Sequence, residues 1–333
     1  MIIDFNKIDI NDQYIYTLDV SILRILLKDK TTGKNIIWAT DEYSSVGTGY
    51  NANDHIYPQD VEGLASIIKP RVVKSKNQQT NRARGMAEVF TPSWVCNNQN
   101  NLVDTEWFGR KDVFNIETEK GWVTVEDKIV FPDTPGKTWQ DYVKANRLEI
   151  TCGEAPYLAS RYDAVTGEII PVKNRIGLLD RKLRVVSENV DSEPEWYKWA
   201  KKAFQSVYGF DWQGDNVLLA RENLLFTFMD YYENKFGVPP IKPYLIEIAK
   251  ILAWNIFQMD GIKFVIPNSC KPVTNTTLTV FGEEVTETPC PGCQKGDHGK
   301  HNGIYVRTYD WSANRSVEFY STFIKEKKRN VKV

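Results

Sequence analysis

The last quarter of the chain carries sulfur and imidazole groups at a spacing that could bind a metal ion. Cys290 and Cys293 form a Cys-x-x-Cys pair around Pro-Gly, with Cys270 upstream and His298 and His301 downstream. This pair is typical of a zinc knuckle, and three thiolates with one imidazole would complete a closed, structural site. We predict Cys270, Cys290, Cys293 and His301 as ligands, with His298 as the alternative histidine. A redox Cys-x-x-Cys is the competing interpretation, but the Pro-Gly and the polar residues after it disfavour that function.

A second stretch could bind a nucleotide-like ligand. From Arg147 the chain reads RLEITCGEAPYLASRYD, and from Ile176 it reads IGLLDRK. Each contains a short apolar run beside an acid, and a Cys-Gly turn with a helix-like segment lies between them. This order is typical of a βαβ unit whose first turn faces a ligand. Cys152 could instead be a small buried residue after an ordinary strand.

Four elements together resemble the S-adenosylmethionine-binding motifs of adenine-N6 DNA methyltransferases, over roughly residues 80–270. The matching residues are Phe90, Thr91 and Pro92, then Glu149, Cys152 and Gly153, then Asp180, then Asp215 in Gly-Asp-Asn. The resemblance implies that the Phe-Thr-Pro element and the Cys-Gly turn contact the methionine part of the cofactor. It also implies that Asp180 ends the second strand and binds the ribose hydroxyls, and that Asp215 contacts the adenine.

The catalytic motif of that family is missing. Asn/Asp/Ser-Pro-Pro-Tyr/Phe binds the target amine and stacks on the flipped base. This chain contains no Asn-Pro, and its only Pro-Pro lies between Val238 and Ile241. By chain order Asn268 is the remaining catalytic candidate. We therefore expect a DNA adenine methylase of a restriction-modification system, or a degenerate subunit of one that acts with a partner. The alternative is a non-catalytic, zinc-stabilised DNA-binding or assembly protein on the same fold.

A run of cations without acids precedes these motifs. Clustered Lys and Arg favour phosphate contacts because they release counterions from DNA. We predict DNA contacts from this run, although a solvated loop explains it equally well. Its members are Lys69, Arg71, Lys74, Lys76, Arg82 and Arg84.

A third function, a metal-dependent nuclease, would use Asp112, Glu126 and Lys128. In such sites carboxylates hold a divalent ion and a lysine assists water activation. The alternating pattern around Glu126 and Lys128 is compatible with a strand, which that interpretation requires.

Composition sets the class of protein. The chain has 333 residues, 42% of them hydrophobic, and a net charge of −1, so any basic surface must be local. No apolar run reaches the ~20 residues of a membrane helix, and no signal peptide is visible. We expect a cytoplasmic protein without a membrane partner.

The predicted fold is α/β, with a Rossmann-like core of the S-adenosylmethionine-dependent methyltransferase type. Residues 1–80 form an N-terminal extension, 81–265 the core with a hairpin insertion at 112–140, and 266–333 a zinc ribbon. Helices are predicted from Ser192 to Gly209, from Leu218 to Phe236 and from Pro243 to Gly261. Residues 13–27 suit a buried strand or helix, and residues 35–40 suit a strand.

Overall fold

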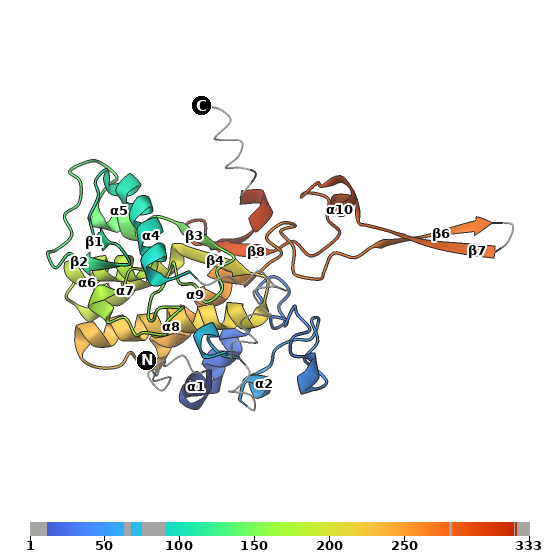
Figure 1. Ribbon diagram of the computed structural model, residues 1–333, viewed down its shortest axis with the longest axis horizontal. Helices are drawn as coiled ribbons and strands as arrows, with labels where there is room; N and C mark the ends of the chain where they lie inside the picture. Colours follow the sequence, from blue (N-terminus) through green and yellow to red (C-terminus); the bar gives the residue numbers. More distant parts are fainter. Residues whose placement is uncertain (1–11, 63–67, 75–90, 280–281, 323, 325–333) are drawn as a thin grey trace.

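The structure is a computed structural model that describes residues 12–62, 68–74, 91–279, 282–322 and 324. It is a mixed α/β fold with small sheets (Figure 1). The helices are α1 (Asp12–Leu26), α2 (Pro58–Glu62), α4 (Ser93–Phe108), α5 (Trp139–Lys144), α6 (Leu178–Asn189), α7 (Glu193–Gln205), α8 (Gly214–Phe236), α9 (Lys242–Asn255) and α10 (Pro291–Lys295), with the 3₁₀ turns η2 (Ser44–Val46), η3 (Arg71–Val73) and η4 (Val172–Asn174). The strands are β1 (Asn115–Thr118), β2 (Gly121–Thr124), β3 (Arg147–Ile150), β4 (Val207–Asp211), β5 (Ile256–Gln258), β6 (Val273–Thr279), β7 (Gly282–Thr288), β8 (Arg307–Asp310) and β9 (Arg315–Glu318).

A parallel sheet of three strands, in the order β3-β4-β5, lies at the centre of the chain. Helices α6 and α7 connect β3 to β4, and α8 and α9 connect β4 to β5. Successive side chains of a strand point to opposite faces. Val207 and Ile256 enter the large hydrophobic core, whereas Phe210 and Phe257 enter a smaller cluster. The sheet is therefore covered by two separate cores.

The three predicted helices are present, but their boundaries differ: α8 begins at Gly214 rather than at the predicted Leu218. Helix α7 begins after Ser192, and α8 ends at Gly237, whose φ of 71° suits a glycine C-cap. Helices α7 and α9 end earlier than predicted, because the chain turns into the strands that begin at Val207 and Ile256. The two missed strands are the ones that complete the parallel sheet.

The N-terminal region shares the main core. Residues of α1 and of the segment after it, including Leu23 and Trp38, belong to the same buried cluster as α8 and α9. The Gln258 side chain accepts a hydrogen bond from the Ile37 N–H at 3.0 Å and donates one to the Ile37 carbonyl at 2.8 Å. Within the described part of this region, residues 35–40 form isolated bridges rather than the predicted strand, such as the one between Ile37 and His55.

Three antiparallel hairpins lie outside the parallel sheet in the described part of the chain: β1–β2, β6–β7 and β8–β9. The β1–β2 hairpin forms within the predicted insertion at 112–140. The longer β6–β7 hairpin projects from the rest of the molecule (Figure 1). Across the residues that the structure describes, no helix combines the length and the apolar character needed to cross a membrane.

Candidate functional site

The predicted metal ligands meet near the C-terminus. One ligand atom from each of four side chains lies within 4.8 Å of all the others: Cys270, Cys290, Cys293 and His301. A tetrahedral zinc ion requires Sγ–Sγ separations of about 3.8 Å and Sγ–N separations of about 3.5 Å. Cys270 Sγ lies 3.7 Å from Cys293 Sγ, and His301 Nδ1 lies 3.5 Å from Cys290 Sγ. The 3.0 Å between the sulfurs of Cys270 and Cys290 would have to widen slightly. This group could hold a metal ion such as zinc.

The Cys-Pro-Gly-Cys turn brings the backbone close to the ligands. Cys290 is the N-cap of α10, and its sulfur accepts the Cys293 N–H at 3.4 Å. A Cβ on Gly292 would lie 2.6 Å from both the backbone N and Nδ1 of His301. Only glycine therefore allows the histidine to approach. Burial alone would raise the pKa of the Cys290 thiol, but hydrogen bonds from Cys270, His301 and two backbone N–H groups lower this pKa to about 5. The turn thus favours a thiolate.

The structure distinguishes between the two histidines. His301 has its backbone N–H bonded to the Tyr305 hydroxyl at 3.0 Å, and that hydroxyl donates to the His298 carbonyl at 2.7 Å. The His298 ring packs edge-on against Phe264, with centroids 5.7 Å apart. His298 is therefore a packing residue beside the ligand group, and His301 belongs to the group.

A small core joins the metal-ligand region to the sheet. Buried Phe264, Ile266 and Val306 cluster with Phe210 of β4 and Phe257 of β5. Backbone bonds from Ile266 to Ile304 and from Val306 to Phe264 pair the chain before the first ligand with the chain after the last. We call residues 264–322 the metal module. Its apolar core is small compared with the main one.

The turn after β3 is the other predicted site. Thr151, Gly153 and Ala155 all have positive φ values, of 46°, 52° and 61°. Such strained backbone is enriched at functional sites. The Gly153 N–H donates to the carboxylate of Asp211, the last residue of β4, at 2.9 Å. A Cβ on Gly153 would meet nothing within 4 Å, so the outer side of this turn is open. Cys152 instead is buried, and Gly209 leaves room for its sulfur.

The prediction that Asp180 ends a strand is wrong. Asp180 lies in the first turn of α6 and is 0% exposed. Its carboxylate accepts the N–H and hydroxyl of Ser160 and the N–H of Gly177. An acid in the first turn of a helix is favoured by the helix dipole. Asp180 therefore stabilises the start of α6, and the strand-end acid of the second strand is Asp211.

The other predicted cofactor residues lie around the main core. Asp215, in the first turn of α8, is 0% exposed, accepts the Tyr43 hydroxyl at 2.6 Å and pairs with Lys74 at 3.5 Å. Thr91 lies just before α4, and its carbonyl accepts a weak hydrogen bond from the Cys96 thiol at 3.9 Å. Pro92 caps α4, and Phe90 lies outside the described residues. Asp215 lies beside Asn216, whose side-chain amide donates to Asp211 at 3.3 Å, so the start of α8 lies next to the acid that accepts the Gly153 N–H.

Asn268 lies in the metal module. It occupies a turn just before Cys270, with φ of 60°. Asn adopts this left-handed conformation more readily than most residues. The left-handed backbone is a structural reason for an asparagine at this position.

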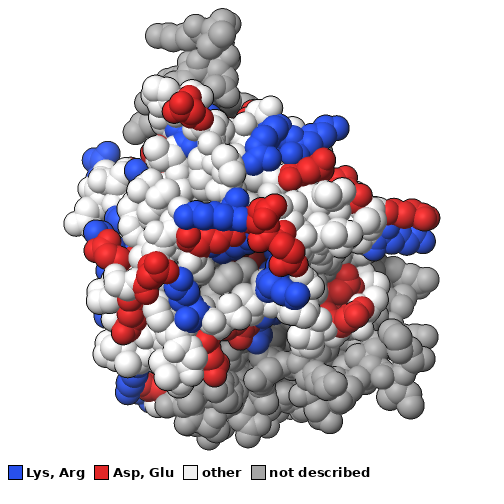
Figure 2. Space-filling model, turned by 90° about the vertical axis from the view of Figure 1, so that its left-hand side faces the viewer, with Lys and Arg blue, Asp and Glu red and all other residues white. Residues whose placement is uncertain are grey.

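The basic run does not form an exposed surface where the structure describes it. Arg71 and Lys74 are buried, and Lys69 is half-buried, so the first two are not positioned to contact phosphates. Lys76, Arg82 and Arg84 lie outside the described residues. On the face shown in Figure 2, Lys and Arg side chains lie next to Asp and Glu rather than in one basic patch.

The residues of the nuclease interpretation are not on a strand. Strand β2 ends at Thr124, so Glu126 and Lys128 lie in the loop after it. Both are exposed, as is Asp112. The backbone carbonyls of Val125 and Asp127 accept hydrogen bonds from Arg184, which fixes this loop as a structural connection.

Glu149 gives the β3 turn a predicted pH dependence. Its carboxylate accepts the N–H groups of Tyr157 at 3.3 Å and Leu158 at 3.1 Å. Burial raises the pKa of this carboxyl from 4.5 to about 8, the two N–H groups oppose the shift, and Asp211 adds to it. Between these values the folded state holds a proton that the unfolded state has lost. The contribution of Glu149 to stability should therefore fall as pH rises from about 4.5 to about 8.

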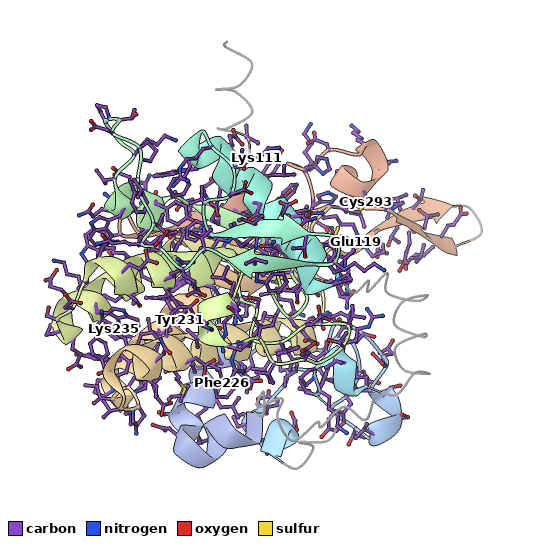
Figure 3. All side chains as sticks on the ribbon, turned by 60° about the vertical axis from the view of Figure 1, so that its left-hand side comes forward. Lys111, Glu119, Phe226, Tyr231, Lys235 and Cys293 are labelled. Atoms are coloured by element: carbon purple, nitrogen blue, oxygen red, sulfur yellow. The ribbon has the colours of Figure 1, made fainter. Side chains whose placement is uncertain are left out.

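Urea unfolding across this pH range tests the Glu149 prediction. Glu149 should lower the unfolding free energy of the wild type by up to about 4 kcal/mol as the pH rises over this range. Glu149→Gln should lack this decrease. Glu119→Gln, in the exposed turn between β1 and β2 (Figure 3), is the matched control and should keep the wild-type slope. Equal slopes in all three proteins would contradict the assignment.

Asp211 is the site residue that sequence reasoning missed. The signal was present, because Val-Tyr-Gly-Phe-Asp is a short apolar run that ends in an acid. The first residues of this run also fit the end of a helix, and the sequence predicts a helix up to Gly209, whereas α7 ends at Gln205 and its C-cap is Ser206.

The structure therefore contains two candidate sites. One is the metal-ligand group near the C-terminus, and the other is the strained turn at the carboxyl end of strand β3. Comparison with models of known protein families, with curated proteins and with solved structures finds no match to this chain.

Proposed function

We propose that the chain binds S-adenosylmethionine and acts as a methylase subunit of a restriction-modification system. The observation that carries the proposal is the open turn at Gly153, whose N–H is held by Asp211 at the end of the neighbouring strand. In open α/β sheets, ligands bind outside the carboxyl ends of the strands. The parallel β3-β4-β5 order with helical connections supports a Rossmann-like core at this position.

Each residue of the turn has a role in this proposal. Gly153 lets a ligand approach the backbone, because it carries no side chain. Asp211 replaces Asp180 as the acid that would bind the ribose hydroxyls. Glu149 holds the turn through the N–H groups of Tyr157 and Leu158. The cofactor would supply the methyl group, and because the Asn-Pro-Pro element that binds the target amine is missing, a partner subunit would have to bind that amine.

We also propose that the metal is zinc and that its role is structural. Three thiolates and one imidazole are ligands that zinc prefers, and four protein ligands leave no coordination position for a substrate. The position of the group in the metal module, away from the β3 turn in sequence, supports a stabilising role.

Calorimetric titration of the metal-replete protein with S-adenosylmethionine tests the cofactor proposal. Gly153→Asn puts a side chain into the open space outside the turn, while asparagine tolerates the left-handed backbone. It should weaken binding at least tenfold. Gly136→Asn is the matched control, because Gly136 also has positive φ and open surroundings in an exposed loop. It should bind like the wild type.

Thermal unfolding of both variants separates loss of binding from loss of folding. A folded wild type that gives no heat at millimolar ligand would overturn the proposal. That result would favour the alternative of a zinc-stabilised DNA-binding or assembly protein. Equal weakening by both glycine variants would move the ligand away from the β3 turn.

A further inference from the structure

Strand β3 has an unpartnered edge. In the part of the chain that the structure describes, β3 pairs with β4 and with no second strand. Parallel strands are usually buried on both faces, and a free apolar edge is a template for pairing with another chain. Leu148 is 46% exposed and Ile150 is 65% exposed, on the face opposite Glu149. This edge therefore presents both backbone groups and apolar side chains to a partner.

The β6–β7 hairpin is a projecting element that could pair with such an edge. Its strands pair with each other and, among the described residues, with no other strand, and the hairpin projects from the body beside Cys293 (Figures 1 and 3). A two-stranded hairpin alone is marginally stable in water. The register pairs Thr276 with Val285 and Leu278 with Glu283, so Leu278 and Val285 share one face. They are 81% and 61% exposed.

The β6–β7 hairpin and the segment that leads into the β3 edge are complementary in charge. The stretch from Pro272 to Pro289 contains three glutamates and no lysine or arginine. The stretch that leads into β3, from Lys137 to Arg147, contains three cations and one acid. The acidic composition of the hairpin also disfavours a nucleic acid as its partner, because phosphates would be repelled. A protein surface that is basic and apolar fits it better.

We propose that two copies of the chain associate by reciprocal strand addition. The β6–β7 hairpin of each copy pairs along the β3 edge of the other, with Leu278 and Val285 against Leu148 and Ile150. Seven residues of strand extend about 23 Å, enough to cover the four residues of β3, which extend about 13 Å. In a closed twofold dimer, both the β6–β7 hairpin and the β3 edge of each copy gain a strand partner. An unlike partner would leave either the hairpin or the edge exposed.

Sedimentation velocity of the metal-replete full chain tests this proposal without any ligand, so its outcome does not depend on cofactor binding. The wild type should sediment at twice the chain mass of 38.4 kDa. Val285→Lys on the hairpin and Ile150→Lys on the receiving strand should each weaken the dimer at least tenfold. Thr286→Lys adds the same charge to the opposite face of β7 and should leave the dimer intact.

Circular dichroism melting should show all three variants folded, because each substituted side chain is exposed. A wild type that stays monomeric at 100 μM (roughly the weak end of specific association) would overturn the proposal. So would a Thr286→Lys variant that dissociates as readily as Val285→Lys. A dimer that survives Ile150→Lys but not Val285→Lys would overturn the assignment of β3 as the receiving edge.

Discussion

Removing the metal should unfold the metal module while the main core stays folded. The module has only a few buried apolar side chains of its own, chiefly Phe264, Ile266 and Val306. The large core of helices and sheet is a separate cluster. Structural zinc contributes about 10–16 kcal/mol of apparent binding free energy in small zinc domains, which is more than such a small core can replace. Chelation should therefore make the chain cleavable by protease C-terminal to Phe264, with most helical circular dichroism retained.

The two neighbouring histidines provide a matched pair for this experiment. His301→Gln should lose the metal and reproduce the effect of chelation, because His301 Nδ1 is one of the four ligand atoms. His298→Gln removes an imidazole that packs against Phe264 and should keep about one metal ion per chain. Elemental analysis with limited proteolysis measures both effects. A fully metallated His301→Gln protein, or a chelated protein that resists protease, would contradict a structural metal.

The metal-ligand group could be predicted because its ligands follow a local rule. A Cys-x-x-Cys turn holds two thiolates by itself, and chain spacing leaves few choices for the other ligands. His301 is followed by Asn302-Gly303, a pair that favours a turn of the chain back toward the module. In the structure Asn302 does pair with Lys271, through hydrogen bonds of 3.1 Å and 2.8 Å, and so closes the module.

The parallel sheet was harder to predict because two of its strands are short and follow helices directly. Strand β5 has only the residues from Ile256 to Gln258. A few apolar residues after a helix fit its last turn as well as a buried strand. The same ambiguity made Asp180 look like the end of a strand, although an acid there is also typical of the first turn of a helix. Only the pairing of β4 with β3 and β5 shows that these runs are strands and not helix ends.

The contacts of the N-terminal region could not be predicted from local pattern at all. Gln258 bonds to Ile37 across most of the chain, and Gly214 is needed because a Cβ would lie 2.0 Å from the Ile37 carbonyl. Neither Gln258 nor Gly214 carries a motif that signals a partner so distant in sequence. Residues before the predicted core are therefore part of its packing, which the proposed boundary near residue 80 did not anticipate.

Arg221→Met should destabilise the whole protein by about 3–5 kcal/mol, because the buried guanidinium donates hydrogen bonds to backbone carbonyls at the ends of two helices. Arg221 is 0% exposed in α8. It donates to the carbonyl of Leu26, at the end of α1, and to that of Lys28 at 3.0 Å. It also donates to Ala253 at 3.2 Å and Ile256 at 2.8 Å, at the end of α9. Helix C-termini leave such carbonyls without partners, and a methionine can donate to none of them.

Thermal unfolding at pH 7 measures this effect, since burial lowers the pKa of Arg221 only to about 10 and the side chain stays charged. At about 2–4 °C per kcal/mol, the melting temperature of Arg221→Met should fall by roughly 10 °C. Arg24→Met, an exposed position in the last turn of α1, is the matched control and should melt within about 2 °C of the wild type. Arg221→Lys should recover only part of the lost stability, because an ammonium cannot donate to the carbonyls of both helices at once as the planar guanidinium does. A melting temperature of Arg221→Met equal to that of Arg24→Met would show that the packing of α1 and α9 does not depend on this side chain.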